Sequence, residues 1–391
     1  MITHRGARLP APRDLRLDFF RGLALFSIFI DHIPDNVASR FALQALGLAD
    51  AAEVFILIAG YAGGMVYGRH FIAGSTVVGM ARIYHRVWQL YVAHIFLFAV
   101  FLATVAHTVA SVNSALYVEE LGAADFLREP DIALVKALTL QFQPAFMDIL
   151  PLYIVLLAIL PMVLWSYRYV PAVALAGSLA LWLAVLAFDG LALPAYPGPD
   201  QVWLFNPMGW QALFFFSAYL GWRASRGHIA AFDRPWLLYA ALAYAGFCFW
   251  LRNHAAVHDD FDSLPASLLA MLAPYLDKSD LSPLRLLNVL AWGLIVTRLF
   301  KPDAALLSGR LARPFILCGR HSLYVFCLGI LLSVIGHFII NENYGGAGLQ
   351  LAVSFGGGAI MTGVAALMEW FAIMSKPTSR RVEAPSRSGA E

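Results

Sequence analysis

The sequence is poor in charge and in cysteine. Of its 391 residues, 13% are charged and 60% are hydrophobic, whereas a soluble domain typically has about 25% charged residues. The three cysteines, Cys248, Cys318 and Cys327, lie in apolar segments and indicate neither a disulfide framework nor a metal site. The sequence also has no glycine-rich phosphate loop, zinc-ligand cluster or nucleophile elbow. This composition predicts a polytopic membrane protein without any of these common soluble active sites.

Long apolar runs are abundant instead. A helix needs roughly 20 residues to cross a hydrocarbon core about 30 Å thick. We therefore predict an all-α integral membrane protein, a bundle of about ten transmembrane helices. The predicted spans are residues 17–33, 50–68, 87–110, 148–166, 170–188, 208–222, 236–251, 284–300, 315–338 and 349–373. Gln141, Gln143 and Pro144 interrupt the apolar segment 137–147, which we expect to be interfacial or re-entrant.

Basic residues are concentrated in alternate loops, and this sets the predicted orientation. Most of the 27 Lys and Arg residues precede the first span, follow the last one or lie in every second loop. The positive-inside rule then places both termini in the cytoplasm. We expect the opposite loops, 111–147 and 252–283, to cap an outer cavity. Residues 1–375 form one predicted membrane domain, and residues 376–391 have the composition of a disordered cytoplasmic tail.

The first predicted span carries ionisable groups where a membrane helix normally has none. Asp18 and Arg21 are near its start, and Asp31 and His32 are near its end. Asp or Arg at a bilayer centre costs roughly 2.5–3.5 kcal/mol on insertion scales, so such residues indicate a functional site. At about 100° and 1.5 Å per residue, Arg21 and His32 share one helix face and lie about 16 Å apart along the axis. Asp18 shares this face, and Asp31 does not.

Each of these groups also has a structural explanation. Asp18 and Arg21 are three residues apart and can neutralise each other on one face of the helix. A lone membrane histidine is often a structural hydrogen-bond partner, and for His32 by itself the two explanations are evenly balanced. The charged neighbours of His32 favour a function. Three single histidines on apolar helices are predicted to be satisfied core residues: His94, His107 and His337.

The second predicted span begins with two carboxylates, Asp50 and Glu53. Because this span starts at the outer face, both lie near the membrane level of His32. For Asp50 we favour capping of the helix N-terminus, where the helix dipole stabilises negative charge. Glu53 lies one turn further along. A carboxylate at this level can hold the tautomer of His32 and support its protonated form, as a general base requires.

Two groups of basic residues lie on the predicted cytoplasmic side. Arg82, His85 and Arg86 form a cluster at the start of the third span, and Arg320 lies in the ninth. Topology, lipid phosphates and snorkelling explain these residues without a ligand, and we favour this explanation. The functional alternative for the cluster is a binding site for an anionic nucleotide cofactor.

Several stretches of the sequence carry a family resemblance. They are Leu17-Asp18-Phe19-Phe20-Arg21-Gly22-Leu23-Ala24-Leu25, Asp31-His32-Ile33-Pro34-Asp35-Asn36, Asp50-Ala51-Ala52-Glu53-Val54-Phe55 and Gly60-Tyr61. Together they closely resemble the OpgC family, which is known for succinylating osmoregulated periplasmic glucans. The chain is also similar to the wider acyltransferase-3 type membrane enzymes, in which an Arg and a His separated by ten residues on the first helix are required. Arg21 and His32 are the matching positions, and Gly319-Arg320-His321-Ser322-Leu323-Tyr324 agrees as well.

The resemblance implies a multi-pass enzyme of the bacterial inner membrane. It would move an acyl group, succinyl by the family, from cytoplasmic acyl-CoA to a hydroxyl of a periplasmic glucan. Acyl-CoA is then a substrate, and we expect no tightly bound cofactor and no metal. The expected partners are the glucan, the donor and membrane lipids, and not nucleic acid. Whether the acyl group is succinyl or acetyl stays open.

The resemblance also implies roles for the charged residues. His32 is the predicted general base, oriented by Asp31 or Glu53. Arg21 binds the phosphates or the carbonyl of the donor, and Asp18 positions Arg21. The predicted donor-binding cations are Arg82, Arg86 and Arg320. A succinyl carboxylate needs a cation when it is buried, and Arg320 is no better a candidate for that cation than Arg86 or Arg252.

A transporter or a flippase for a lipid-linked sugar is the alternative from another class. In such a protein Asp18, Arg21 and His32 form a proton or substrate relay, and no chemistry occurs. A purely structural membrane subunit is the third candidate, but it does not need this density of ionisable groups on its first two spans. Release of free CoA in the presence of glucan separates the enzyme from the transporter.

Overall fold

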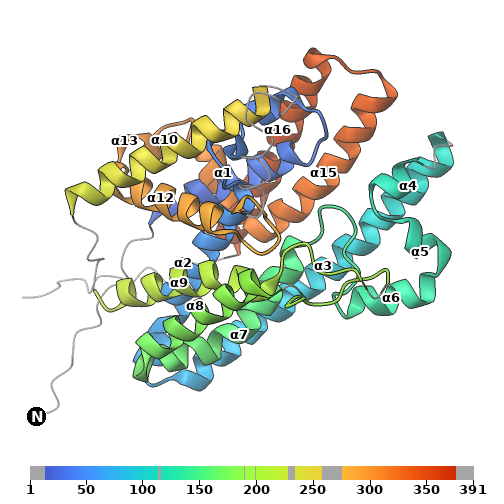
Figure 1. Ribbon diagram of the computed structural model, residues 1–391. Coiled ribbons are helices and arrows are strands. Elements are labelled where there is room, and N and C mark those ends of the chain that lie inside the picture. Colours follow the sequence, from blue (N-terminus) through green and yellow to red (C-terminus); the bar gives the residue numbers. More distant parts are fainter. Residues whose placement is uncertain are drawn as a thin grey trace, which may run out of the picture.

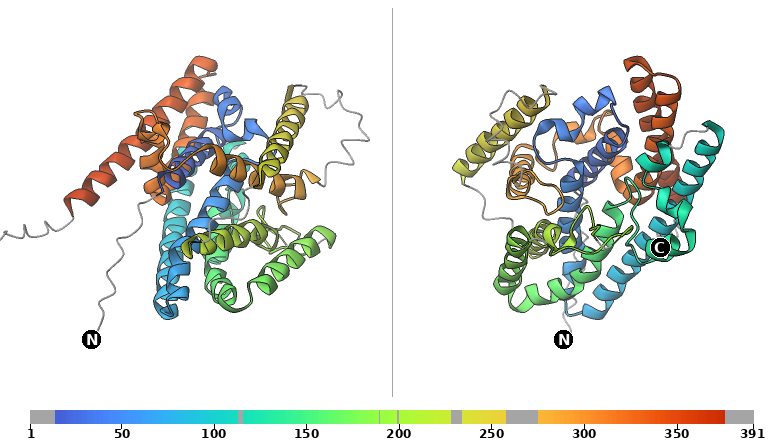
Figure 2. Two further views of the ribbon diagram at one scale, coloured as in Figure 1. Left: turned by 90° about the vertical axis from the view of Figure 1, so that its left-hand side faces the viewer. Right: turned by 45° about the vertical axis from the view of Figure 1, so that its right-hand side comes forward.

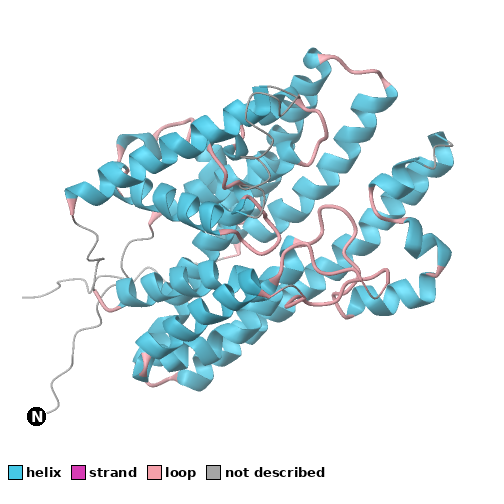
Figure 3. Cartoon of the chain, viewed as in Figure 1, coloured by secondary structure: helices cyan, strands magenta, loops and turns pink. Residues whose placement is uncertain are grey.

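The computed structural model describes residues 14–112, 116–188, 190–198, 200–227, 234–257 and 275–375, and helices dominate these ranges (Figure 1, Figure 3). Within them the only β-type pairing consists of two isolated bridges, Phe142 with Tyr196 and Pro194 with Val202. Three sequence features lie outside the described residues: the predicted tail 376–391, the arginines at positions 5, 8 and 13 before the first span, and the middle of the predicted outer loop 252–283.

A helix occupies the place of each predicted span. The long helices are α1 (Leu15–Asp31), α2 (Ala51–Ile72), α3 (Thr76–Val112), α7 (Ile149–Tyr169), α8 (Pro171–Ala187), α9 (Pro207–Ser225), α10 (Pro235–Val257), α12 (Pro283–Leu299), α15 (Ser322–Glu342) and α16 (Ala347–Met374). The short ones are η1 (Val37–Phe41), η2 (Leu43–Leu46), α4 (Leu116–Glu120), α5 (Ala124–Arg128), α6 (Pro130–Leu138), α13 (Ala305–Ser308) and α14 (Arg313–Arg320). The prediction of one continuous helix over 315–338 is wrong, because the chain leaves helical geometry at His321, between α14 and α15.

Five helices of the described chain are long and apolar enough to cross a membrane: α2, α3, α7, α15 and α16. The apolar helix α8 is shorter. The count of ten spans and the cytoplasmic termini therefore stay predictions. The segment 139–148 after α6 is irregular, with positive φ at Leu140 and Phe146, in agreement with the interruption predicted there.

Helices α1 and α2 lie in the middle of the molecule (Figure 1, Figure 2). α1 packs against α14, α15 and α2, while α2 packs against α9, α3 and α7. One continuous cluster of buried apolar side chains connects these helices. α10 and α12 pack on each other through a small separate cluster of Ala241, Ala245, Ala291 and Ile295. Asp18 of α1 and Glu53 of α2 are thereby buried between helices.

Glycine allows the close contact between helices α2 and α9. A Cβ atom added at Gly64 would collide with the backbone carbonyl of Ala218, and one added at Gly221 would collide with that of Tyr61. Small residues let helix backbones approach closely in membrane proteins, where apolar burial gives little driving force between helices. The position of α2 therefore depends on the absence of side chains here.

Replacement of Gly64 by valine is expected to lower the free energy of unfolding by about 1–3 kcal/mol, the usual cost of overpacking. The matched control is Gly363→Val on α16, where an added Cβ meets nothing within 4 Å. Unfolding of the detergent-solubilised protein by heat measures both variants. Equal stability of the two variants would contradict the close contact between α2 and α9.

Candidate functional site

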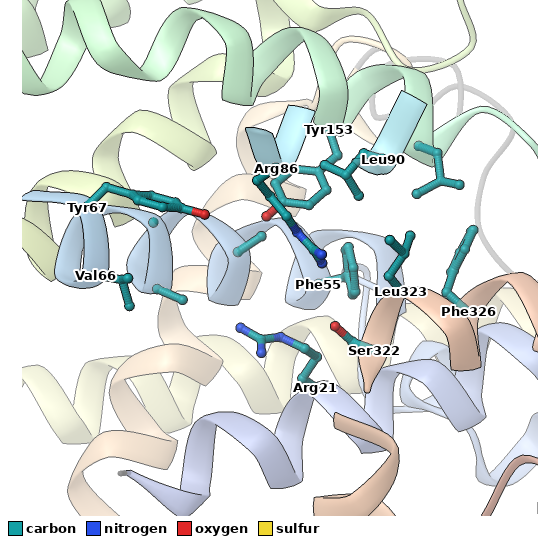
Figure 4. A pocket seen from close by; sticks show the side chains of 14 residues that line it. Arg21, Phe55, Val66, Tyr67, Arg86, Leu90, Tyr153, Ser322, Leu323 and Phe326 are labelled. Atoms are coloured by element: carbon teal, nitrogen blue, oxygen red, sulfur yellow. The ribbon is translucent and has the colours of Figure 1, made fainter. Parts of the chain in front are cut away.

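A cavity of about 160 Å³ lies between α1, α2, α3, α7 and α15. Figure 4 shows Arg21 from α1 and Arg86 from α3 extending into it from opposite sides. Its hydroxyl groups come from Tyr67, Tyr153 and Ser322. The rest of the lining is largely apolar. Two guanidinium groups in such a space favour an anionic ligand with an apolar portion.

A groove of about 540 Å³ adjoins this cavity along α2 and α3. Tyr67 and Arg86 line both spaces, and Arg82 and His85 line the groove. Gln89 accepts a hydrogen bond from Nη1 of Arg86 at 3.1 Å, and its Nε2 lies 3.1 Å from Nε2 of His85. The basic cluster at the start of α3 is therefore continuous with the cavity that contains Arg21.

The buried carboxylate of Asp18 lies between two arginines. Its Oδ1 is 4.0 Å from Nη1 of Arg21, and its Oδ2 is 3.8 Å from Nε of Arg320. The second contact requires α1 and α14 to be very close, and Gly319 permits this, because a Cβ there would collide with the backbone carbonyl of Asp18. The geometry is compatible with the predicted positioning of Arg21 by Asp18.

Arg320 is held by α16 as well. Its Nη1 lies 2.8 Å from Oε1 of Glu369, and the other carboxylate oxygen lies 3.0 Å from Nε2 of His321. Arg320 does not line the cavity, although Ser322, two residues further along, does. Our sequence analysis missed Glu369. Its only signal was that it is the single acidic residue of the apolar helix α16.

His32 lies at the opposite end of α1 from Arg21. It forms the C-cap of the helix, and its backbone N–H donates to the carbonyl of Ile28 at 3.1 Å. Its ring packs on Phe146 with 4.5 Å between the ring centroids. Nδ1 of His32 is buried and has no hydrogen-bond partner among the described residues. Asp31 accepts a hydrogen bond from Nε2 of Gln44 at 2.8 Å, so its described partner is Gln44.

The two carboxylates at the start of α2 form a capping box. Oδ1 of Asp50 accepts the N–H of Ala52 at 2.8 Å, and the N–H of Asp50 donates to Glu53 at 3.0 Å. The capping role favoured for Asp50 is thus confirmed. Glu53 is completely buried, and Arg285 of α12 lies 2.6 Å from it. The described contacts of Glu53 do not include His32, so its predicted orienting role would have to be indirect.

A loop cation completes this cluster. Nζ of Lys278 lies 2.6 Å from Oδ2 of Asp50, and Arg285 reaches the same oxygen at 3.3 Å. Burial by itself would lower the pKa of Lys278, but Asp50 and Glu53 raise it above its ordinary value. Lys278 therefore stays charged. The indole of Trp210 holds this loop, because its Nε1 donates to the carbonyls of Lys278 and Ser279 at 3.1 Å each.

A family model described as OpgC protein matches residues 13–373, nearly the whole chain. The chain belongs to the OpgC family. None of the curated proteins and none of the solved structures compared with it matches. Membership supports a membrane-bound transferase that modifies glucans. The resemblance noted mainly in the first two predicted spans thus extends through α16.

No sequence pattern pointed to Lys278, Arg285 or Asp148 as members of a site. Asp148 precedes α7, and burial raises its pKa to about 6. Asp148 ends the irregular segment 139–148 and Lys278 lies in the loop before α12, whereas Arg285 lies in the first turn of α12. Nothing in the local sequence indicates that these segments return to the start of α2.

The three single histidines differ from one another. His337 has partners, with Nε2 at 3.0 Å from Glu120 and 3.2 Å from Asn341. The prediction of a satisfied core residue is wrong for His107, which is exposed. It is also wrong for His94, which is completely buried but has no hydrogen-bond partner for either ring nitrogen among the described residues.

Proposed function

We propose that this OpgC-family protein is an O-acyltransferase of the bacterial inner membrane that moves an acyl group, succinyl by its family, from cytoplasmic acyl-CoA to hydroxyls of periplasmic glucans. One observation carries the proposal. Arg21 and Arg86 share a cavity that continues into the basic groove of α3, and His32 lies at the far end of the helix that bears Arg21. The site thus has cations for the donor at one end and a base for the acceptor at the other.

The groove and the cavity suit the parts of acyl-CoA. Phosphate groups are bound best by arginine, whose planar donors match their oxygens, and Arg82 and Arg86 supply cationic groups in the groove, with the ring of His85 beside them. The cavity beyond them has apolar walls interrupted by a few hydroxyl groups, which suits the pantetheine arm with its amides. We assign Arg82 to the phosphates, and Arg86 and Arg21 to the part of the donor inside the cavity.

The reaction needs a base for the attacking hydroxyl. In our proposal a neutral His32 accepts the proton of the glucan hydroxyl while its oxygen forms a bond to the thioester carbon. The bond from this carbon to sulfur then breaks. The thiolate leaves and takes the proton from His32, which releases free CoA and the acylated glucan.

A succinyl donor brings a second carboxylate, which is costly to bury without a cation. Of the three candidate arginines, only Arg86 lines the cavity. Arg320 is paired with Glu369 and lies close to Asp18, and Arg252 is exposed on α10. These contacts favour Arg86 over Arg320 and Arg252, with Arg21 facing it across the cavity.

The direct test is thiol release by the purified protein in liposomes. Succinyl-CoA and acetyl-CoA are supplied separately, with and without a periplasmic glucan, and free CoA is titrated with a thiol reagent. We expect release that depends on the glucan and is faster with succinyl-CoA. Glucan movement across the membrane without thiol release would overturn the proposal in favour of a transporter.

Replacement of Arg86 by glutamine is expected to raise the KM for acyl-CoA about 10- to 100-fold, because hydrogen bonds to charged groups contribute about 1.5–3 kcal/mol. The same assay over a range of donor concentrations measures this effect. The control Arg313→Gln removes an exposed positive charge outside the groove and should leave the KM unchanged. An unaltered KM in the Arg86 variant would remove Arg86 from the donor site.

A further inference from the structure

His94 is an unusual residue for the middle of a membrane helix. It lies on α3 with no exposed surface, and both of its ring nitrogens lack a hydrogen-bond partner among the described residues. A buried polar group without a partner costs free energy that an apolar side chain of similar size does not. Packing alone therefore does not account for a histidine at this position.

The helix geometry places His94 next to the cavity. One face of α3 carries Arg86, Leu90 and His94, because each is four positions after the one before it. Neighbours in this row are about 6 Å apart along the helix. Arg86 and Leu90 line the cavity (Figure 4). The cavity lining on α3 ends at Leu90, and His94 is one turn further along.

The next turn of α3 leads to His32. Phe98, four residues after His94, packs edge-on against Phe142 with 5.7 Å between the ring centroids. Phe142 belongs to the irregular segment 139–148, whose Phe146 packs on the ring of His32. His94 thus lies on α3 between the cavity that contains Arg21 and Arg86 and the segment that covers His32.

We propose that His94 contacts the acyl thioester when the donor extends from the cavity toward His32, and that its ring N–H donates a hydrogen bond to the thioester carbonyl oxygen. This inference rests on the proposed acyl transfer. As the glucan oxygen adds to the carbonyl carbon, negative charge develops on that oxygen, and His94 stabilises it. When the carbon–sulfur bond breaks, the carbonyl re-forms and the thiolate leaves with the proton that His32 had accepted.

This assignment explains why His94 has no hydrogen-bond partner within the described ranges. A donor aimed at the position where charge develops has no ligand until the substrate arrives. Such preorganised donors act strongly in a site without water, because there is no solvent to screen them. The same imidazole has a second nitrogen, which can accept a hydrogen bond from an amide of the pantetheine arm.

The test compares His94→Leu, His94→Gln and the control His107→Leu in the thiol-release assay. We expect His94→Leu to lower kcat by about 10²–10³-fold, the typical effect of removing one such donor, with a much smaller change in the KM for acyl-CoA. His94→Gln keeps an N–H donor and should recover part of the rate. His107 is an exposed histidine on the same helix, and its replacement should leave kcat unchanged.

Thermal unfolding of the same preparations separates this role from a structural one. Leucine removes the two ring nitrogens that have no hydrogen-bond partner among the described residues. The His94→Leu variant should therefore unfold at the wild-type temperature or above it, although it loses activity. If both His94 variants lose activity only in proportion to lost folded protein, or keep the wild-type kcat, the proposal for His94 is overturned. If the wild type itself releases no CoA, the acyltransferase proposal fails first, so the two failures are distinguishable.

Discussion

Replacement of His32 by alanine is expected to lower glucan acylation by about 10²–10⁴-fold, the usual contribution of a general base. The protein should remain folded, because the helix capping at this position uses the backbone of His32, and the buried Nδ1 has no hydrogen-bond partner in the part of the chain that the structure describes. The substitution removes the packing of the ring on Phe146. The measurement is the charge and acyl content of periplasmic glucans from cells that lack this protein and carry either wild type or His32→Ala.

The matched control is His107→Ala, which should restore acylated anionic glucan as well as wild type does. The amount of each variant in the membrane fraction must be equal for the comparison. Normal glucan modification by the His32 variant would remove this residue from the mechanism. If wild type itself restored no acyl groups, the glucan assignment would be wrong, and transport or another acceptor would be the leading explanation.

Replacement of Arg285 by methionine is expected to lower the free energy of unfolding by about 3–5 kcal/mol, because breaking a buried ion pair leaves an uncompensated charge. Arg285 lies 2.6 Å from Glu53, a carboxylate with no exposed surface, and 3.3 Å from Asp50. Lys278 contacts Asp50 but not Glu53 in the described structure. Glu53 would therefore lose the charged partner that the structure describes. Denaturant unfolding of the solubilised protein measures the resulting change in the free energy of unfolding.

The double variant Arg285→Met with Glu53→Gln should recover much of this loss, because no buried charge is then left without a partner. The two single variants and the double variant form a cycle that isolates the energy of the pair. The control is Arg252→Met, which removes an exposed arginine from α10. If Arg285→Met lowers the free energy of unfolding no more than Arg252→Met does, there is no buried ion pair at the start of α2.

The features predicted well are local in sequence. Apolar length located the helices, because each helix is formed by neighbouring residues. The capping of α2 by Asp50 was also predictable, since the carboxylate and the N–H groups that it caps are adjacent in the chain. The break at His321 was missed, although Gly319, Arg320, His321 and Ser322 interrupt the apolar run at this point.

The contacts between charged groups were not predictable in the same way. Asp18 meets Arg320, and Arg320 meets Glu369 on a third helix. The local alternative, pairing of Asp18 with Arg21, is present as well, at 4.0 Å. Which of these contacts form depends on how closely α1 and α14 approach, and the glycines at their contact decide this. A pattern within one helix carries no information on such a distance.

The sequence by itself determined that the chain is helical and rich in membrane-length apolar runs, and it predicted Arg21 and His32 on one face of the first helix. Its short motifs carried the resemblance to the OpgC family, which the family model extends to residues 13–373. All of these features concern residues close together in the chain. Only the tertiary structure decided that Arg86 joins Arg21 in one cavity and that Arg285 neutralises Glu53. These pairs come from helices far apart in the sequence, and the packing of whole helices against one another brings them together.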